Sequence, residues 1–153
     1  MTLSDLIPSG GVAVDLAATS RKQALHALSE LAHRRLDIPA RPLLEAVMER
    51  EKLGSTGVGD GVAIPHARLP GVERTCGLFA RLKQSVDFDA VDGHPVDLVF
   101  MLIAPEDSGA EHLKALARVA RMFRREEIRR ALRAAPDADA AYAILDGSVV
   151  NAA

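Results

Sequence analysis

The chain of 153 residues lacks most features of secreted and membrane-spanning proteins. It has a single cysteine, Cys76, which excludes an intrachain disulfide and a thiolate metal cluster built from this chain alone. No segment approaches the roughly 18 consecutive apolar residues of a transmembrane helix. The first residues, MTLSDLIPSGG, also lack the basic and apolar regions of a signal peptide. We therefore predict a cytoplasmic protein without direct membrane insertion.

A positive net charge is absent as well. The 19 basic and 21 acidic side chains leave a formal charge of −2, so no overall positive field exists to hold nucleic acid, and no nucleic-acid partner is expected. Six arginines between Arg121 and Arg133 are interrupted by Glu126 and Glu127, and we interpret them as a solvated face or a partner-docking surface. Apolar residues make up 48% of the chain, which is typical of a soluble globular domain. We predict that residues 1–153 form one domain.

Helical and strand-like patterns alternate along the chain. Apolar residues three and four positions apart predict helices over residues 21–36, from the Pro39–Pro42 region to Gly54, over 109–123, from about 126, and over 137–145. Strands are expected at residues 12–16, 62–64, 76–82 and 96–104, the last buried on both faces. Ser20 is a predicted N-cap, and Ser108 with Glu111 fits a capping box. The pattern predicts an α/β fold with a mixed β-sheet flanked by helices on both faces.

The most reactive candidate follows a glycine-rich segment. Residues 54–61, GSTGVGDG, hold four of the 11 glycines and predict a loop, after which strand 62–64 ends at Pro65 and leaves His66 at the strand's end. An imidazole with a pKa of about 6.5 is substantially unprotonated near neutral pH, so one ring nitrogen can attack phosphorus. Backbone N–H groups of a loop can turn towards phosphoryl oxygens. We therefore predict a phosphate-cradling loop made of Gly54, Ser55, Thr56, Gly57, Gly59, Asp60 and Gly61.

Two further residues offer groups that a phosphoryl site needs. Arg50 ends the helix before the loop, and its guanidinium could fork onto two phosphoryl oxygens. His112 falls in the first turn of a predicted helix, where the N-terminus favours an anion. The sequence does not place either residue beside His66. A solvated helix-end charge at Arg50, and structural roles for both histidines, remain open interpretations.

Other chemistries find little support. Five histidines raise the question of a metal site, but no HxxxH, HxH or HExxH spacing is present, so we predict neither metal nor cofactor. The GK[ST] of a phosphate loop is missing, which argues against a nucleotide-dependent enzyme. His26, His33 and His94 are interpreted as structural or solvated, and Cys76 as a small core residue.

The segment from Arg50 to Leu69, REKLGSTGVGDGVAIPHARL, closely resembles the active-site signature of phosphotransferase-system enzyme IIA domains of the fructose, mannitol and nitrogen-regulatory class. The segments VDFDAVDGHPVDLVFMLIAP and AEHLKAL resemble the next blocks of that family, and the nitrogen-regulatory branch fits best. The resemblance covers the chain from roughly Leu3 to Leu145. It implies that His66 is the phosphorylated histidine, His112 the second active-site histidine and Arg50 the active-site arginine. It also implies a small histidine-containing phosphocarrier protein as the phosphoryl donor.

Two positions depart from the family pattern. Ala67 follows His66 where the family usually has glycine, which would restrict the donor's approach if the backbone needs positive φ. Asp60 replaces an asparagine or glutamate, and its carboxylate either orients His66 or faces water.

The predicted function is that of a phosphoryl-transfer component with a mainly regulatory role. It accepts a phosphoryl group on His66 and signals to regulatory target proteins by its phosphorylation state. Two alternatives stay open: a sugar-uptake enzyme IIA that passes phosphate to a separate enzyme IIB, and a docking module that is not phosphorylated. From the length of the chain we expect no attached enzyme IIB or membrane domain.

Overall fold

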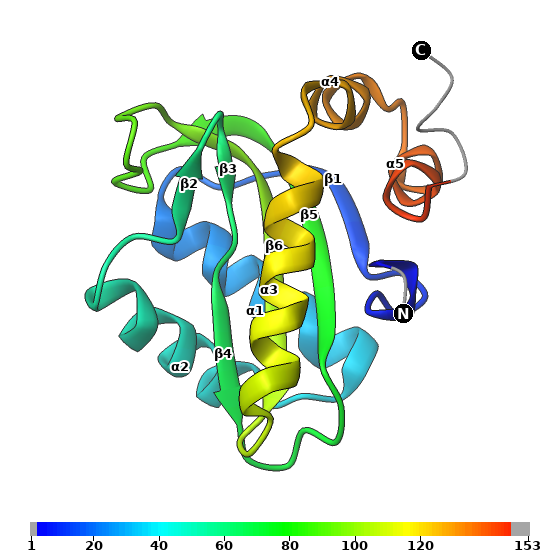
Figure 1. Cartoon of the computed structure of the whole chain (residues 1–153). Helices are drawn as coiled ribbons and strands as arrows, with labels where there is room; N and C mark the ends of the chain where they lie inside the picture. The colour runs from blue at the N-terminus through cyan, green and yellow to red at the C-terminus, as the bar shows by residue number, and fades with distance from the viewer. Residues whose placement is uncertain (1–2, 148–153) are drawn as a thin grey trace.

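The computed structural model describes residues 3–147 and shows a β-sheet between two layers of helices (Figure 1). A short 3-10 helix, Leu3–Asp5, opens the described chain. The elements that follow it, in chain order, are β1 (Val12–Leu16), α1 (Arg21–Leu36), α2 (Ala40–Lys52), β2 (Gly57–Gly59), β3 (Val62–Ala63), β4 (His66–Leu69), β5 (Cys76–Val86), β6 (Val96–Pro105), α3 (Gly109–Phe123), α4 (Glu126–Ala134) and α5 (Ala138–Leu145).

The sheet is mixed, as predicted. Its strand order is β1-β5-β6-β3-β2, and β4 pairs with β6 beyond the end of β3. The pairs β1–β5, β3–β6 and β4–β6 are parallel, whereas β5–β6 and β2–β3 are antiparallel. Within the described residues β4 pairs only with β6, so β4 lies at an edge of the sheet.

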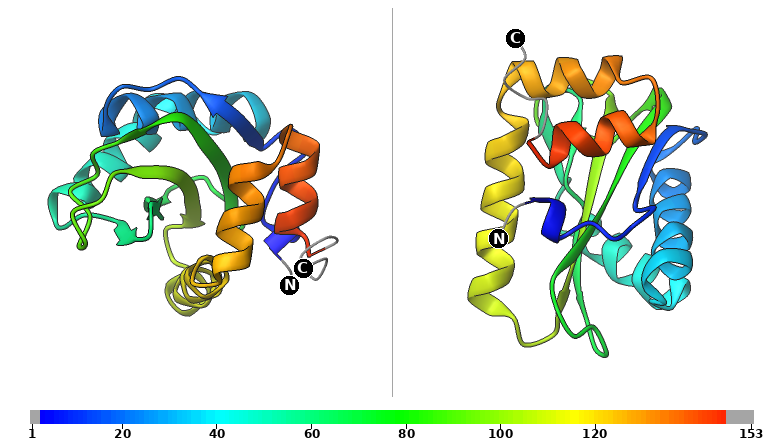
Figure 2. Two further views of the ribbon diagram at one scale, coloured as in Figure 1. Left: turned by 90° about the horizontal axis from the view of Figure 1, so that it is seen from above. Right: turned by 90° about the vertical axis from the view of Figure 1, so that its right-hand side faces the viewer.

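Strand β6 shows why helices cover both faces. Its side chains alternate, because successive residues of a strand point to opposite faces. Val99, Met101 and Ile103 pack in a core with α1 and α2, while Phe100 and Leu102 pack in a second core with α3, α4 and α5. Figure 2 shows the two helical layers on opposite sides of the sheet. The predictions of a doubly buried strand and of helices on both faces are confirmed.

The two predicted helix starts have different outcomes. The Ser20 side chain accepts a hydrogen bond from the Gln23 N–H at 3.1 Å, so the predicted N-cap of α1 is confirmed. The capping box at Ser108 is wrong, because its hydroxyl donates to the Pro105 carbonyl oxygen at 2.7 Å and makes no cap bond. The backbone of Ser108, at φ −90° and ψ 20°, lacks the extended geometry that aims an N-cap side chain at the helix.

The chain around the glycine-rich segment is more regular than predicted. Gly57–Gly59 forms β2 inside the expected loop, and His66 begins β4 instead of ending a strand. Strand β5 likewise continues to Val86, past its predicted end. A Cβ on Gly57 would lie 2.8 Å from the Cβ of Ala90, so this glycine allows β2 to pack against the segment that follows β5. That close approach joins residues distant in sequence, which local composition does not reveal.

Candidate functional site

His66 is held by hydrogen bonds to both ring nitrogens. Its Nδ1 lies 2.9 Å from the Ile64 carbonyl oxygen, and a carbonyl can only accept, so Nδ1 carries the proton. Its Nε2 therefore has a free lone pair, and it accepts a hydrogen bond from the Nε–H of Arg50 at 3.2 Å. The two partners fix the same tautomer. This leaves Nε2 as the nucleophilic nitrogen of the ring.

Arg50 reaches His66 because α2 ends beside the edge strand β4. The residue lies in the last turn of α2, and its guanidinium also donates to the Gly54 carbonyl oxygen at 2.8 Å. The turn that ends the helix therefore holds the arginine that faces the imidazole. Arg50, for which the sequence left open the role of a solvated helix-end charge, instead hydrogen-bonds to His66.

His112 approaches from the opposite helical layer. It lies in the first turn of α3 with an exposed fraction of 4%, and the centroids of the His66 and His112 rings are 5.4 Å apart. Burial, followed by the positive charges that His66 and Arg68 can carry, lowers the pKa of His112 to about 4. Its Nδ1 is buried and has no hydrogen-bond partner within residues 3–147. At neutral pH His112 is thus an uncharged neighbour of His66.

The pKa of His66 is also lowered from its ordinary value. Burial is the largest cause, and the positive charges of Arg50 and Arg68 act in the same direction. The hydrogen bond to the Ile64 carbonyl and the charge of Glu51 oppose this shift. His66 is consequently unprotonated at neutral pH, which keeps the Nε2 lone pair free to react.

A shallow depression of about 450 Å³ surrounds these groups. Two of its side chains, Leu53 and Leu113, are apolar yet 85% and 63% exposed. It also contains Arg68, which the sequence analysis missed, although residues two apart on a strand share a face and Arg68 is two positions after His66. The depression is lined by Ala46, Glu49, Arg50, Leu53, His66, Ala67, Arg68, His112, Leu113 and Leu116. A cationic and apolar surface around a reactive nitrogen suits an anionic group carried by a protein.

The predicted phosphate-cradling loop lies only partly beside His66. Gly54 contacts Arg50, and the Thr56 carbonyl oxygen accepts from the Ile64 N–H at 3.0 Å. Asp60, in contrast, lies at the turn between β2 and β3, where its carbonyl oxygen accepts from Arg133 at 2.7 Å. None of residues 54–61 lines the depression. The cradle therefore stays a prediction, and among the described contacts of residues 54–61 it is Gly54 that hydrogen-bonds to Arg50.

The two departures from the family pattern now have structural explanations. Ala67 lies in strand β4, and its φ is not positive. Its side chain packs in the core with an exposed fraction of 8%. The restriction expected for a positive-φ position does not apply there. The side chain of Asp60 is 68% exposed, and its Oδ2 lies 3.9 Å from Arg129. The Asp60 carboxylate therefore faces water, which is one of the two interpretations that the sequence left open.

The predicted arginine cluster does not form one uncompensated patch. Arg125 pairs with Glu127 at 2.6 Å, Arg130 lies 3.8 Å from Glu126, and Arg133 forks onto the Asp97 carboxylate. These contacts favour the solvated-face interpretation.

Within residues 3–147 no group of three or more histidine, cysteine or acidic side chains is arranged to hold a metal ion. None of the helices described there has the length and apolarity needed to cross a membrane.

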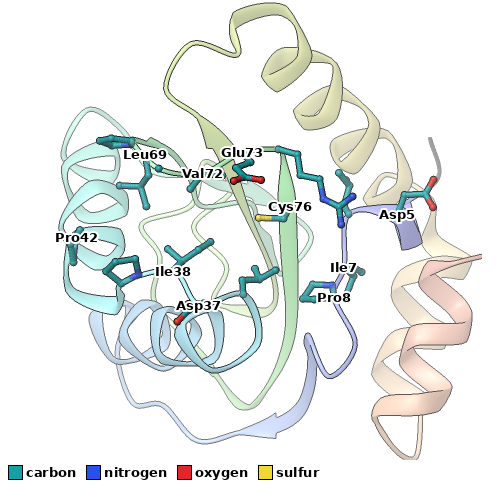
Figure 3. Close-up of a pocket in the computed structure, with 16 residues that line it drawn as sticks. Asp5, Ile7, Pro8, Asp37, Ile38, Pro42, Leu69, Val72, Glu73 and Cys76 are labelled. Carbon is teal, nitrogen blue, oxygen red and sulfur yellow. The ribbon is translucent and has the colours of Figure 1, made fainter.

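A larger hollow of about 650 Å³ lies where three connecting segments meet: the start of the chain, the α1–α2 connection and the β4–β5 connection (Figure 3). Cys76 contributes to its wall and is 8% exposed, as predicted for a small core residue. Burial raises the pKa of the Cys76 thiol to about 11, so the thiol is unreactive at neutral pH. None of the predicted site residues lines this hollow.

Comparison with known proteins shows the family to which this chain belongs. Residues 5–148 match the family described as phosphoenolpyruvate-dependent sugar phosphotransferase system, EIIA 2. The chain belongs to this family. A protein of Bradyrhizobium diazoefficiens named nitrogen regulatory protein is 49% identical to this chain over 145 residues, which cover 95% of each. A nitrogen regulatory protein of Escherichia coli is 43% identical over 127 residues, covering 82% of this chain and 78% of that protein.

Solved structures extend the similarity to the fold. Nitrogen regulatory protein IIA-Ntr from Neisseria meningitidis superimposes with a TM-score of 0.87 at 38% identity, covering 94% of this chain and 98% of that one. IIA mannitol from Escherichia coli shares the fold alone, with a TM-score of 0.75 at 19% identity, covering 91% of this chain and 98% of that one. The resemblance stated from the sequence, including its nitrogen-regulatory branch, is confirmed.

Proposed function

We propose that this chain accepts a phosphoryl group on Nε2 of His66 from a histidine-containing phosphocarrier protein and acts as a regulator through its phosphorylation state. The observation that carries the proposal is the tautomer of His66. Its Nδ1–H is bound to the Ile64 carbonyl, so Nε2 keeps its lone pair and accepts from Arg50, and the residue lines the depression. A nucleophile and a cation are therefore in place before a donor arrives.

The transfer would exchange one nitrogen–phosphorus bond for another. The bond from phosphorus to the donor histidine breaks as the bond to His66 Nε2 forms, and no proton has to leave His66 because Nε2 carries none. Arg50 would release Nε2 and turn its N–H groups to the phosphoryl oxygens, which an arginine fork suits. Arg68 would add positive charge, and His112 a hydrogen bond from a neutral ring. Neither a metal nor a cofactor enters this scheme.

The regulatory role is supported by the relatives, which are named nitrogen regulatory proteins, and by the rim of the depression. Leu53 and Leu113 offer exposed apolar contacts to a target protein. A phosphoryl dianion on His66 would lie at the centre of such an interface, and desolvating it without a partner is unfavourable. An effect of about 3 kcal/mol changes affinity by roughly a hundredfold. Targets should therefore bind the unphosphorylated form.

The decisive experiment mixes the protein with a phosphorylated phosphocarrier and maps the acid-labile adduct. Phosphorus NMR distinguishes Nε2 from Nδ1 phosphohistidine, and intact mass gives the stoichiometry. His26→Ala is the matched control, since the His26 side chain is 60% exposed and lies on α1. We expect one phosphoryl group on Nε2 of His66 in the parent and in the control, and none in His66→Ala. An adduct on another residue would refute the assignment, and no adduct at all would favour a docking module that is not phosphorylated.

A further inference from the structure

Glu51, the residue after Arg50, is a buried carboxylate that the transfer scheme does not use. Its exposed fraction is 5%, although it lies in the last turn of α2 near the surface depression. Its Oε1 lies 3.4 Å from the NH1 of Arg21 and accepts a hydrogen bond from the Thr56 N–H at 3.3 Å. Its Oε2 is buried and has no partner within the described residues. Burying a charge is unfavourable unless it is paired and hydrogen-bonded, so the burial of this carboxylate has to be compensated by its contacts.

A continuous series of hydrogen bonds connects Glu51 to the reactive ring. The His66 Nδ1–H donates to the Ile64 carbonyl at 2.9 Å, and the Ile64 N–H donates to the Thr56 carbonyl at 3.0 Å. The Thr56 N–H then donates to Glu51 Oε1. All three bonds run in one direction and end on the carboxylate. The residue that holds Nδ1 of His66 is thus itself held in place through Thr56.

A second series connects Glu51 to the other side of the ring. The Gly54 N–H donates to the Glu51 carbonyl oxygen at 3.2 Å, and the Gly54 carbonyl accepts from Arg50 NH1 at 2.8 Å. Arg50 in turn donates from Nε to His66 Nε2. The side chain of Glu51 therefore fixes one end of the turn after α2, and its main chain fixes the other. The two series meet at the two nitrogens of His66.

Arg21 completes the arrangement from the start of α1. Its NH1 donates to the Phe88 carbonyl oxygen at 3.2 Å, and the same carbonyl also accepts a hydrogen bond from the Ser55 hydroxyl. The side chain of Arg21 is one third exposed, whereas that of Glu51 is almost fully buried. Arg21 is consequently the counterion that makes a charged Glu51 tolerable in this position.

We propose that Glu51 and Arg21 form a positioning pair for phosphoryl transfer. The pair holds the side chains of His66 and Arg50 in a fixed relative position through the turn formed by residues 53–56. This inference rests on the proposed function, because it assigns the pair to the same reaction. Glu51 is a positioning residue, since its contacts reach the ring only through Thr56 and Ile64 or through Gly54 and Arg50. Its negative charge also favours the protonated form of the His66 ring.

The pair is tested with Glu51→Gln, which removes the charge but keeps an oxygen that can accept the Thr56 N–H. The groups that set the His66 pKa are Arg50 and Glu51 from α2, Arg68 from β4, and burial with the Ile64 bond. Glu51→Gln should lower the His66 pKa and speed the exchange of the Nδ1 proton, both measured by NMR on the unphosphorylated protein. Transfer from the phosphocarrier should slow on the order of tenfold, because small displacements of reacting groups can reduce rates by up to about a hundredfold.

Glu45→Gln is the matched control, with the same chemical change on an exposed part of α2. It should leave the pKa, the proton exchange and the transfer rate at parent values. A purely structural role for Glu51 would lower the melting temperature without speeding the exchange of the Nδ1 proton. An unchanged exchange rate in Glu51→Gln, or equal changes in Glu45→Gln, would overturn the proposal.

Arg21→Gln supplies a second measurement if Glu51→Gln does not fold. It keeps the carboxylate and removes its counterion, so the His66 pKa should move up, opposite to the shift in Glu51→Gln. General loosening of the site would shift both variants in one direction, and a decrease or no change in Arg21→Gln would overturn the proposal. The NMR readouts need no donor. Failure of the phosphorylation assay in the parent protein would therefore refute the proposed function and remain distinguishable from failure of the positioning pair.

Discussion

The buried, uncharged His112 predicts that the protein loses stability in mildly acidic solution. Its pKa is about 4 in the folded protein, against 6.5 for an ordinary histidine. An unfolded chain therefore takes up a proton on this residue below pH 6.5, whereas the folded protein does so only near pH 4. Since the unfolded state binds more protons in this window, the stability contributed by neutral His112 is full above pH 6.5 and declines as the pH falls.

The size of this loss follows from the shift in pKa. Each pKa unit corresponds to about 1.4 kcal/mol, so the complete effect below pH 4 is about 3 kcal/mol. Between pH 7 and pH 5 the expected loss from His112 is about 2 kcal/mol. His66 adds a loss of the same sign, because its pKa is also lowered.

Urea unfolding followed by circular dichroism at pH 7 and pH 5 measures the effect. His112→Gln should remove about 2 kcal/mol of the difference between the two pH values. His26→Gln, a change at an exposed position, should leave the difference as it is in the parent. Equal pH dependence in the parent and in His112→Gln would refute the reasoning, as would an NMR titration showing His112 protonated above pH 6.5. A neutral His112 also means that Arg50 and Arg68 supply the positive charge of the site.

Three further substitutions test the site and the sheet. His66→Ala should abolish phosphoryl acceptance and lower stability by only about 1 kcal/mol for the lost Ile64 bond, and any adduct in its intact mass would contradict this. Arg50→Ala should slow transfer roughly a hundredfold, with partial recovery in Arg50→Lys, which keeps the charge without the planar fork; parent rates in quench-flow would exclude the role. Gly77→Ala should destabilise the protein by about 1–3 kcal/mol, because the added Cβ would lie 2.5 Å from the buried Phe100 ring, and an unchanged denaturation midpoint would contradict that packing.

The sequence by itself determined the layers of the fold and selected three residues of the candidate site. Helical spacing in α1 and the doubly buried run of β6 predict a sheet with helices on both faces, because these periodicities record which side chains avoid water. His66, Arg50 and His112 were selected by their chemistry and by the family signature. Local patterns suffice for such features because each depends on neighbours within a few residues.

The tertiary structure decided which groups act together. Arg50 and His112 come from opposite layers and meet His66 only because β4 is an edge strand between them. The tautomer of His66 depends on the Ile64 carbonyl, and the uncharged state of His112 depends on its burial. Contacts between residues far apart in the chain, and the desolvation they cause, arise only when the chain has folded. No local pattern encodes them, which is why Glu51 gave no signal in the sequence.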